Sequence, residues 1–140
     1  MDSARALRVL PIQEQLVVPV MVSLAEAERY PGAVPLGVLD SGTLVGFMMG
    51  QLIPSGAWAG DYLVWDYLID ARYQGRGLGR AGMVGAIELA ASAGAQGMRI
   101  ACDPANRIAR SLYDSLGFVD QGTTNDDGEN EMRLELAPQT

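Results

Sequence analysis

The most informative stretch of the sequence is a loop rich in glycine and arginine, Arg72-Tyr73-Gln74-Gly75-Arg76-Gly77-Leu78-Gly79-Arg80. It follows an apolar run at 62–69 that is typical of a strand, and it opens a segment with helical periodicity at 81–93. Its glycines leave backbone N–H groups accessible to an anion, and the N-terminus of the following helix adds partial positive charge. Arg76 and Arg80 supply formal charges that suit a pyrophosphate. The loop by itself therefore indicates either a phosphate-binding site or a structural turn.

Two well-known phosphate-binding loops do not match this spacing. A P-loop needs Gly-Lys-Ser/Thr after its first glycine, and that tripeptide is absent. A dinucleotide-binding loop needs Gly-x-Gly-x-x-Gly and an acidic residue about twenty positions further on, where this chain has Arg99. The pattern is instead Gln-x-x-Gly-x-Gly, with Gln74, Gly77 and Gly79 at its fixed positions.

A second motif, at residues 106–118, has the character of a short amphipathic helix followed by a strand. Ile108, Leu112 and Leu116 are spaced by four residues, which predicts one buried stripe along the helix. Gly117 suits the left-handed residue that ends such a helix.

Two polar side chains in this motif are candidates for a site. Asn106 stands at the start of the helix, where an amide either caps the backbone or reaches outward. Tyr113 lies off the apolar stripe. Its hydroxyl either faces a cleft, or its ring is simply a partly buried aromatic group.

The two motifs, in this order, resemble the signatures of the GCN5-related N-acetyltransferase (GNAT) family. The acetyl-CoA loop of that family is written Gln/Arg-x-x-Gly-x-Gly/Ala, and its second signature is Asn-x-x-Ala-x-x-Leu-Tyr-x-x-x-Gly-Phe. The second signature is matched by Asn106, Ala109, Leu112, Tyr113, Gly117 and Phe118. The resemblance is strongest over residues 62–120, and it implies an α/β fold with a mixed central sheet and flanking helices. It also implies acetyl-CoA as cosubstrate and no metal.

Turn and strand patterns give an element order that fits this fold. Residues 36–52 predict a β-hairpin with its turn at Ser41-Gly42, and Ser23-Leu24-Ala25-Glu26 predicts a capped short helix. The family usually begins with a further strand, but only about ten residues precede Gln13. We therefore expect the first strand to be short or missing. That would expose a sheet edge near Leu36–Asp40 and favour a homodimer.

Composition predicts a single domain over residues 1–140 in the cytoplasm. The net charge of −7 argues against nucleic acid as a partner, since such proteins need a basic face, and it favours a cationic substrate. The chain has no histidine, which excludes histidine catalysis and histidine metal ligands. The single cysteine, Cys102, is expected to be a buried thiol in a reducing compartment. No signal peptide or apolar segment of membrane-spanning length is evident.

The resemblance implies direct attack of an amine on the thioester, without a covalent enzyme intermediate. It assigns Tyr113 as the acid that protonates the departing thiolate. Asp66 is the first candidate for the base, with Glu28 and Glu129 as the others, and a chain of waters could replace all three. The expected cofactor-binding residues are Leu68, Ile69, Gln74, Gly75, Arg76, Gly77, Leu78, Gly79, Arg80 and Asn106.

Shorter matches are most similar to bacterial spermine/spermidine acetyltransferases. They include Gly46-Phe47-Met48 and Leu68-Ile69-Asp70-Ala71-Arg72-Tyr73-Gln74-Gly75. A small polyamine held by carboxylates and aromatic faces agrees with the acidic composition, with Glu28, Trp65 and Glu129 as expected substrate contacts. Two alternatives stay open: acetylation of a protein N-terminus or an aminoglycoside-type amine, and a non-catalytic acetyl-CoA-binding module.

Overall fold

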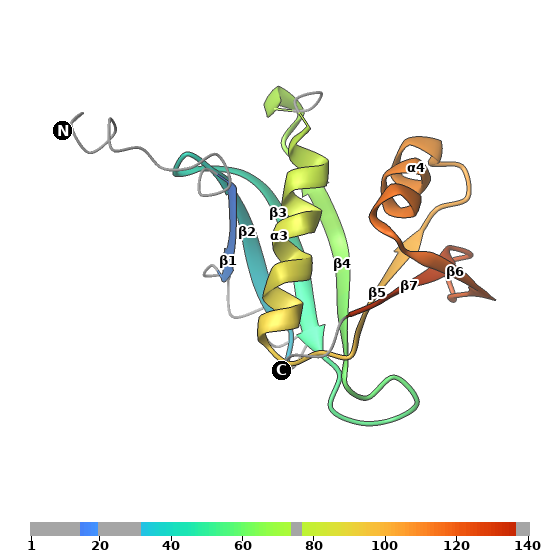
Figure 1. Cartoon of the computed structure of the whole chain (residues 1–140). Coiled ribbons are helices and arrows are strands. Elements are labelled where there is room, and N and C mark those ends of the chain that lie inside the picture. The colour runs from blue at the N-terminus through green and yellow to red at the C-terminus, as the bar shows by residue number, and fades with distance from the viewer. Residues whose placement is uncertain (1–14, 20–31, 74–76, 137–140) are drawn as a thin grey trace.

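The computed structural model describes residues 15–19, 32–73 and 77–136, whose strands form one sheet of seven in the order β1-β2-β3-β4-β5-β7-β6 (Figure 1). The strands are β1 (Gln15–Pro19), β2 (Val34–Asp40), β3 (Thr43–Leu52), β4 (Asp61–Ile69), β5 (Gly97–Cys102), β6 (Val119–Thr124) and β7 (Asn130–Glu135). The helical elements are the 3-10 turn η2 (Ala71–Tyr73), α3 (Leu78–Ser92) and α4 (Arg107–Leu116). The expected mixed sheet with flanking helices is confirmed.

The first strand is short, as expected, but it is present and forms the edge of the sheet next to β2. β1 has five residues and pairs antiparallel with β2 over Leu36–Asp40. The prediction of an exposed edge at Leu36–Asp40 is therefore wrong, because β1 covers it and is itself the outer strand. The helix expected from Ser23 lies outside the described residues.

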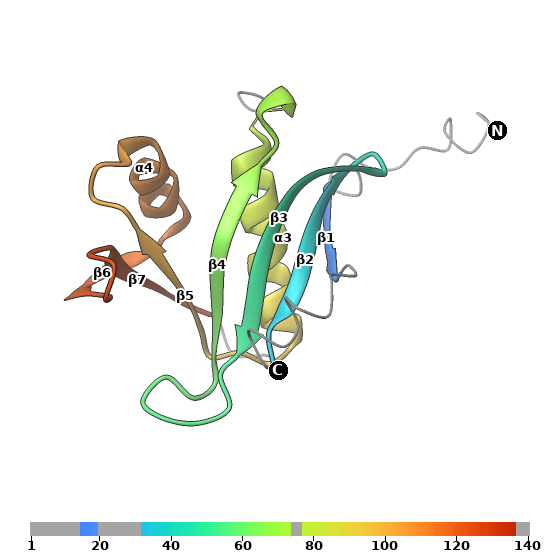
Figure 2. The same ribbon diagram turned by 180° about the vertical axis from the view of Figure 1, so that it is seen from behind.

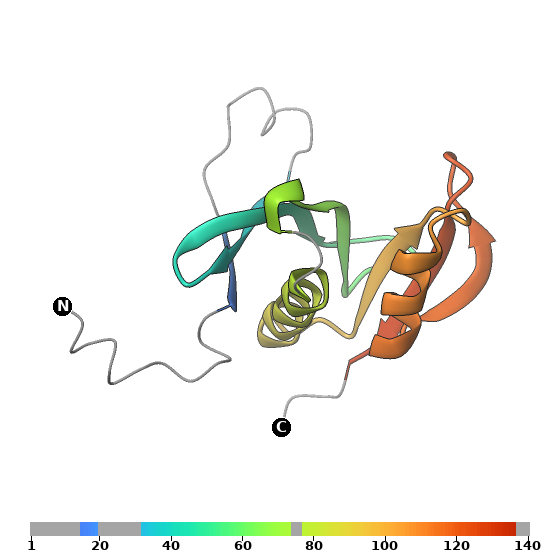
Figure 3. The same cartoon turned by 90° about the horizontal axis from the view of Figure 1, so that it is seen from above.

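The β2–β3 hairpin turns where the sequence predicts. Ser41 and Gly42 both have positive φ, 52° and 86°, which is the backbone geometry of a tight hairpin turn whose twist matches that of the strands. The fully buried side chains of β2 and β3, among them Leu36 and Met48, form part of the hydrophobic core. α3 contributes to the same core, for example through the fully buried Met83. Figure 3 shows α3 lying along the curved sheet, with α4 beside β5, β6 and β7.

α4 begins and ends where the sequence predicts, but it buries a different face. The Asn106 side chain caps its start by accepting a 3.0 Å hydrogen bond from the Ala109 N–H, and Gly117 ends it with φ 99°. The predicted buried stripe is wrong at Ile108, whose side chain is 86% exposed. The helix instead packs through Ala109, Leu112, Tyr113 and Leu116. This set follows the 3.6-residue period more closely than a spacing of four does.

The two parallel strands at the centre of the sheet separate along their length. β5 pairs with β4 only from Asp61 to Leu63, opposite Gly97 to Arg99. Beyond Leu63 the two strands diverge, as Figures 1 and 2 show from opposite sides. The separation of β4 from β5 creates a wedge in the middle of the sheet.

A buried ionic cluster holds the strands together at the closed end of this wedge. Asp61 is only 4% exposed, and its carboxylate accepts hydrogen bonds from Arg99 Nε at 2.7 Å and from Arg133 Nε and Nη2 at 2.9 and 3.0 Å. The Arg133 and Arg99 guanidinium groups hold the pKa of Asp61 below its usual range, although burial works in the opposite direction. Gly97 leaves the space for Arg133, since a Cβ at that position would overlap the guanidinium.

Candidate active site

A cavity of about 530 Å³ occupies the wedge between β4 and β5. Its walls come from β4, β5, α3, α4, β7 and the loop between β6 and β7. Residues from the second predicted motif, from the helix that follows the first motif and from the C-terminal hairpin therefore meet around one space. The lining residues with polar or aromatic side chains are Trp58, Trp65, Asp66, Tyr67, Arg99, Cys102, Asp103, Asn106, Tyr113, Asn125, Asp127, Glu129 and Glu131.

A β-bulge in β4 determines how this strand faces the cavity. Phe47 of β3 pairs with Leu68 and Met49 pairs with Trp65, so β4 has one residue more than β3 over this interval. Asp66 lies in the bulge with φ 54°, in the left-handed region that aspartate tolerates better than most residues. The bulge interrupts strand alternation, and Trp65 and Asp66, although neighbours in sequence, both line the cavity.

The start of α3 fits an anionic group. Its N-cap, Gly77, has φ 77°, and among the described residues no side chain caps the helix. A Cβ added at Gly77 or Gly79 would meet no atom of the described residues within 4 Å. A helix N-terminus that no described side chain caps suits the phosphates of acetyl-CoA.

Tyr113 is the buried polar residue of α4. It is 9% exposed, and its ring meets Phe118 edge-on at 5.8 Å between centroids. Burial raises the pKa of Tyr113 to about 12, with smaller contributions from Cys102 and Glu129. The hydroxyl is therefore protonated at neutral pH and can donate a hydrogen bond into the cavity.

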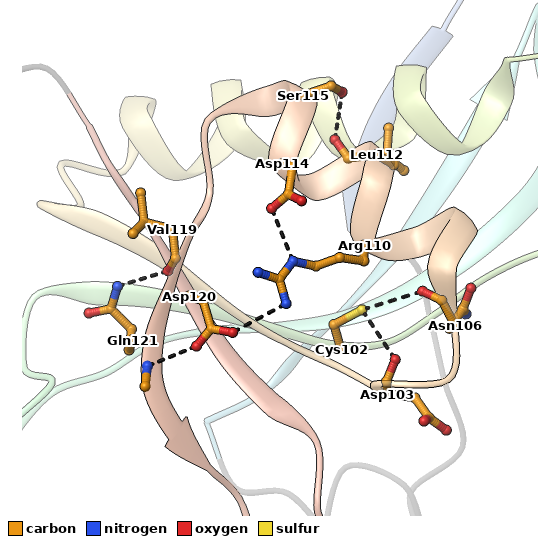
Figure 4. Close-up of polar contacts among 11 residues, drawn as sticks. Cys102, Asp103, Asn106, Arg110, Leu112, Asp114, Ser115, Val119, Asp120 and Gln121 are labelled. Atoms are coloured by element: carbon orange, nitrogen blue, oxygen red, sulfur yellow. Dashed lines mark hydrogen bonds and ion pairs between the residues drawn. The ribbon is translucent and has the colours of Figure 1, made fainter.

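Cys102, at the end of β5, is a buried free thiol, as expected. Its sulfur donates weak hydrogen bonds to the carbonyl oxygens of Asp103 and Asn106, at 3.6 and 3.9 Å (Figure 4). Burial is the largest cause of the raised pKa of the thiol, and neighbouring carboxylates add to it. A thiol that is hard to ionise is a poor nucleophile, so Cys102 is better explained as part of the wall.

Charged groups fix α4 against the neighbouring hairpin. Arg110 forms ion pairs with Asp114 at 3.0 Å and with Asp120 of β6 at 3.2 Å (Figure 4). Arg80 of α3 donates a 2.7 Å hydrogen bond to Ser115 Oγ. The helix that carries Tyr113 is thereby tied both to β6 and to α3.

The predicted site residues fall into three groups. Five line the cavity together: Trp65, Asp66, Asn106, Tyr113 and Glu129. Six lie at the end of β4 or the start of α3 and do not line it: Leu68, Ile69, Gly77, Leu78, Gly79 and Arg80. Four lie outside the described residues: Glu28, Gln74, Gly75 and Arg76.

Sequence reasoning missed Arg99, Asn125 and Glu131, which also line the cavity. Their sequence signals are weak, because Arg99 looks like an interruption of an apolar strand and Asn125 like an ordinary turn residue. In the described ranges, no group of three or more His, Cys, Asp or Glu side chains could hold a metal ion. No helix in the same ranges is long and apolar enough to cross a membrane.

Known structures share this fold. The PaiA N-acetyltransferase of Thermoplasma acidophilum, solved with coenzyme A, has 19% identity and a TM-score of 0.62 over 80% of this chain and 66% of its own. The ribosomal-protein-S18-alanine N-acetyltransferase of Escherichia coli has 20% identity and a TM-score of 0.64, covering 93% and 86%. A GCN5-related N-acetyltransferase of Kribbella flavida has 22% identity and a TM-score of 0.67, covering 89% and 85%.

A search of curated protein sequences gives no match. The model of the acetyltransferase (GNAT) family, in contrast, matches residues 8–118, which is well over half of the chain. Together with the separated strands, the uncapped start of α3 and the buried Tyr113, this match shows that the chain belongs to the acetyltransferase (GNAT) family and is an acetyl-CoA-dependent acyltransferase.

Proposed function

We propose that the protein transfers the acetyl group of acetyl-CoA to a primary amine of a small polycation, a polyamine such as spermine or spermidine. The observation that carries the proposal is the charge of the cavity that Tyr113 lines. Its described lining has five carboxylates: Asp66, Asp103, Asp127, Glu129 and Glu131. The arginine in this lining, Arg99, is already paired with Asp61. A cationic acceptor is favoured in such a cavity, and an anionic one is disfavoured.

The aromatic rings of the cavity support a cationic acceptor in a second way. The Arg99 guanidinium lies over the Trp58 ring, 4.3 Å from its centroid, so Trp58 already has a cation on one face. Trp65 of β4 brings a second indole ring to the same cavity. An ammonium group next to an aromatic face and a carboxylate is well stabilised.

We assign Tyr113 the role of interacting with the sulfur of CoA as it leaves. The amine nitrogen bonds to the thioester carbon, the carbon–sulfur bond breaks, and the Tyr113 hydroxyl donates to the thiolate. A thiol ionises near pH 8.5, whereas the pKa of Tyr113 is about 12. Complete proton transfer from Tyr113 is therefore unfavourable even when the sulfur carries its full negative charge. We assign Tyr113 a hydrogen bond that stabilises the developing thiolate, and the thiolate takes its proton from solvent after it has left.

The amine must lose a proton to attack, and two carboxylates of the cavity are suited to take it. Asp66 is exposed in the β4 bulge, whereas Glu129 is half-buried in the β6–β7 loop. Glu129 lines the same cavity as Tyr113, and its charge contributes to the raised pKa of the Tyr113 hydroxyl. We therefore favour Glu129 for the proton and Asp66 for binding an ammonium group. Cytoplasmic location and a homodimer remain predictions.

The test is thiol release from acetyl-CoA across a panel of acceptors. The panel holds spermine, spermidine, a diamine, a monoamine of equal length, an aminoglycoside and a peptide with a free N-terminus. We expect saturable turnover with the polyamines and a kcat/KM at least about tenfold lower for the monoamine, because one ammonium contact is lost. Preference for the peptide or the aminoglycoside would overturn the acceptor class. Tight acetyl-CoA binding without turnover of any amine would identify a non-catalytic binding module.

A further inference from the structure

We propose that Asn125 is a positioning residue that holds the Glu129 carboxylate in the cavity as the group that accepts the amine proton. This inference rests on the proposed function, because it names the device that prepares the base for that reaction. Asn125 and Glu129 are both half-buried and both line the cavity, at the two ends of the loop between β6 and β7.

The loop is built around the Asn125 side chain. Asn125 Oδ1 accepts hydrogen bonds from the backbone N–H groups of Asp127 and Glu129, at 3.0 and 2.9 Å. The backbone of Asn125 completes the loop, since its N–H donates to the Glu129 carbonyl and its own carbonyl accepts from Gly128, both at 3.0 Å. This network fixes the Asn125 amide plane relative to the backbone.

The orientation of the amide then fixes the Glu129 carboxylate. Two N–H donors point at one end of the Asn125 amide, and only its oxygen can accept them. The NH2 end is therefore directed to the other side, where Nδ2 donates a 3.0 Å hydrogen bond to Glu129 Oε1. Among the described residues, none donates a hydrogen bond to Oε2 of Glu129. One carboxylate oxygen is anchored, and the other is available to a water or an amine.

The charged groups around Glu129 explain why the anchoring of its carboxylate is important for proton transfer. The titratable or charged groups that share the cavity with it are Asp66 and Tyr67 of β4, Arg99, Cys102 and Asp103 at β5, Tyr113 of α4, Asp127 of the loop and Glu131 of β7. Four of these groups are carboxylates, so the cavity is rich in negative charge. The Asn125 amide anchors the Glu129 carboxylate through a neutral donor, without adding a charge to the cavity. Glu129 can then take the proton from the amine, directly or through a water, and release it to solvent after the thiolate has left.

Asn125→Asp is the sharpest test, because aspartate has the same shape as asparagine and only the NH2 donor is replaced by an oxygen. The new carboxylate still accepts the two backbone N–H groups, so the loop geometry is kept. The hydrogen bond to Glu129 Oε1 is replaced by repulsion between two carboxylates at hydrogen-bond distance. Glu129 becomes harder to ionise, and we expect the acid limb of the kcat/KM profile to move up by about one pH unit.

Two further variants separate positioning from a structural effect. Glu129→Gln removes the proton acceptor, and Asn125→Asp should change activity by less than about twofold in that background, because coupled residues are not additive. Gln121→Glu adds the same charge on exposed β6, outside the cavity lining, and should leave the acid limb in place.

A carboxyl-carbon NMR titration of Glu129 in wild type and Asn125→Asp gives a readout without turnover. A shift of this titration to higher pH together with the moved acid limb supports the inference. An unmoved titration, an unmoved limb, or an equal loss of activity in the Glu129→Gln background overturns it. If no amine is acetylated by wild type although the titration moves, the proposed function is what fails, and the Asn125–Glu129 contact stands.

Discussion

The Tyr67 hydroxyl donates a 2.6 Å hydrogen bond to the carbonyl oxygen of Gly79, which joins the bulged part of β4 to the first turn of α3. The ring of Tyr67 crosses directly over Gly82, where a Cβ would collide with the hydroxyl. β4 lines the cavity and the first turn of α3 is the candidate phosphate site. This contact therefore sets the spacing between the cavity and the candidate phosphate site.

Tyr67→Phe should loosen that spacing. The variant loses one half-buried hydrogen bond, so we expect the free energy of unfolding to fall by about 0.5–1.5 kcal/mol. We also expect KM for acetyl-CoA to rise more than kcat falls, because Tyr67 supports the binding end of the site. Urea unfolding and steady-state kinetics measure the two effects. A fall in kcat with unchanged KM would show instead that Tyr67 acts at the reacting atoms.

Tyr113→Phe removes the hydroxyl that we assign to the leaving thiolate. We expect kcat to drop about ten- to a thousandfold, the range of one acid–base group, with little change in the affinity for acetyl-CoA. The buried ring is retained, so the unfolding midpoint should stay close to that of wild type. Turnover equal to wild type in single-turnover assays would remove Tyr113 from the mechanism.

The secondary-structure elements of this site can be predicted from the sequence, whereas its three-dimensional geometry can be predicted only in part. The loop at Gly77, the Asn106 cap and the Gly117 end are each fixed by local backbone chemistry, so they can be predicted from residue types. The bulge at Asp66 cannot, because it depends on how β3 and β4 pair. Ile108 is misassigned for a related reason: the side on which α4 packs is decided by the sheet beneath it.

Long-range contacts account for the rest of what was missed. Asp61 looks like a surface charge at the start of a strand, yet it is buried by two arginines that lie 38 and 72 positions away. Asn125 looks like a loop residue, and its role depends on which way the β6–β7 hairpin folds over the cavity. Such partners are brought together by topology, which composition and periodicity do not encode.

Asp61→Asn should be strongly destabilising. It leaves Arg99 and Arg133 without their shared countercharge, and removing one partner of a buried ionic group costs on the order of 3 kcal/mol. Glu135→Gln is the matched control: it also removes a partner of Arg133, but Glu135 is 77% exposed, so we expect a cost below about 1 kcal/mol. Because the pKa of Asp61 is lowered on folding, its contribution is present above about pH 4 and is lost as the pH falls further. Equal unfolding free energies for the two variants would contradict this account.

The buried tyrosines should make the fold sensitive to alkali. Folding raises the pKa of Tyr113 from its usual value of 10 to about 12, and burial also raises that of Tyr67. Between those pH values the folded state binds more protons than the unfolded state, so stability falls as pH rises. We expect the free energy of unfolding to be unaffected by these groups below about pH 10 and to decline from there toward pH 12. The decline should be smaller in Tyr113→Phe, and an identical slope in both proteins would contradict the assignment to Tyr113.

Asp66→Asn separates the two carboxylates that compete for the role of base. Asparagine tolerates the left-handed backbone of the β4 bulge about as well as aspartate does, so we expect unfolding free energies within about 0.5 kcal/mol. If Asp66 only binds an ammonium group, KM for the polyamine rises while kcat and the acid limb of the pH profile remain. If Asp66 is the base, kcat falls by about a hundred- to ten-thousandfold and the acid limb disappears, which would also overturn the role given to Glu129. Asp66→Val completes the comparison. A β-branched residue at φ 54° is strained by about 1–3 kcal/mol, so its loss of stability reports on the bulge itself and shows how much of any activity change comes from the backbone.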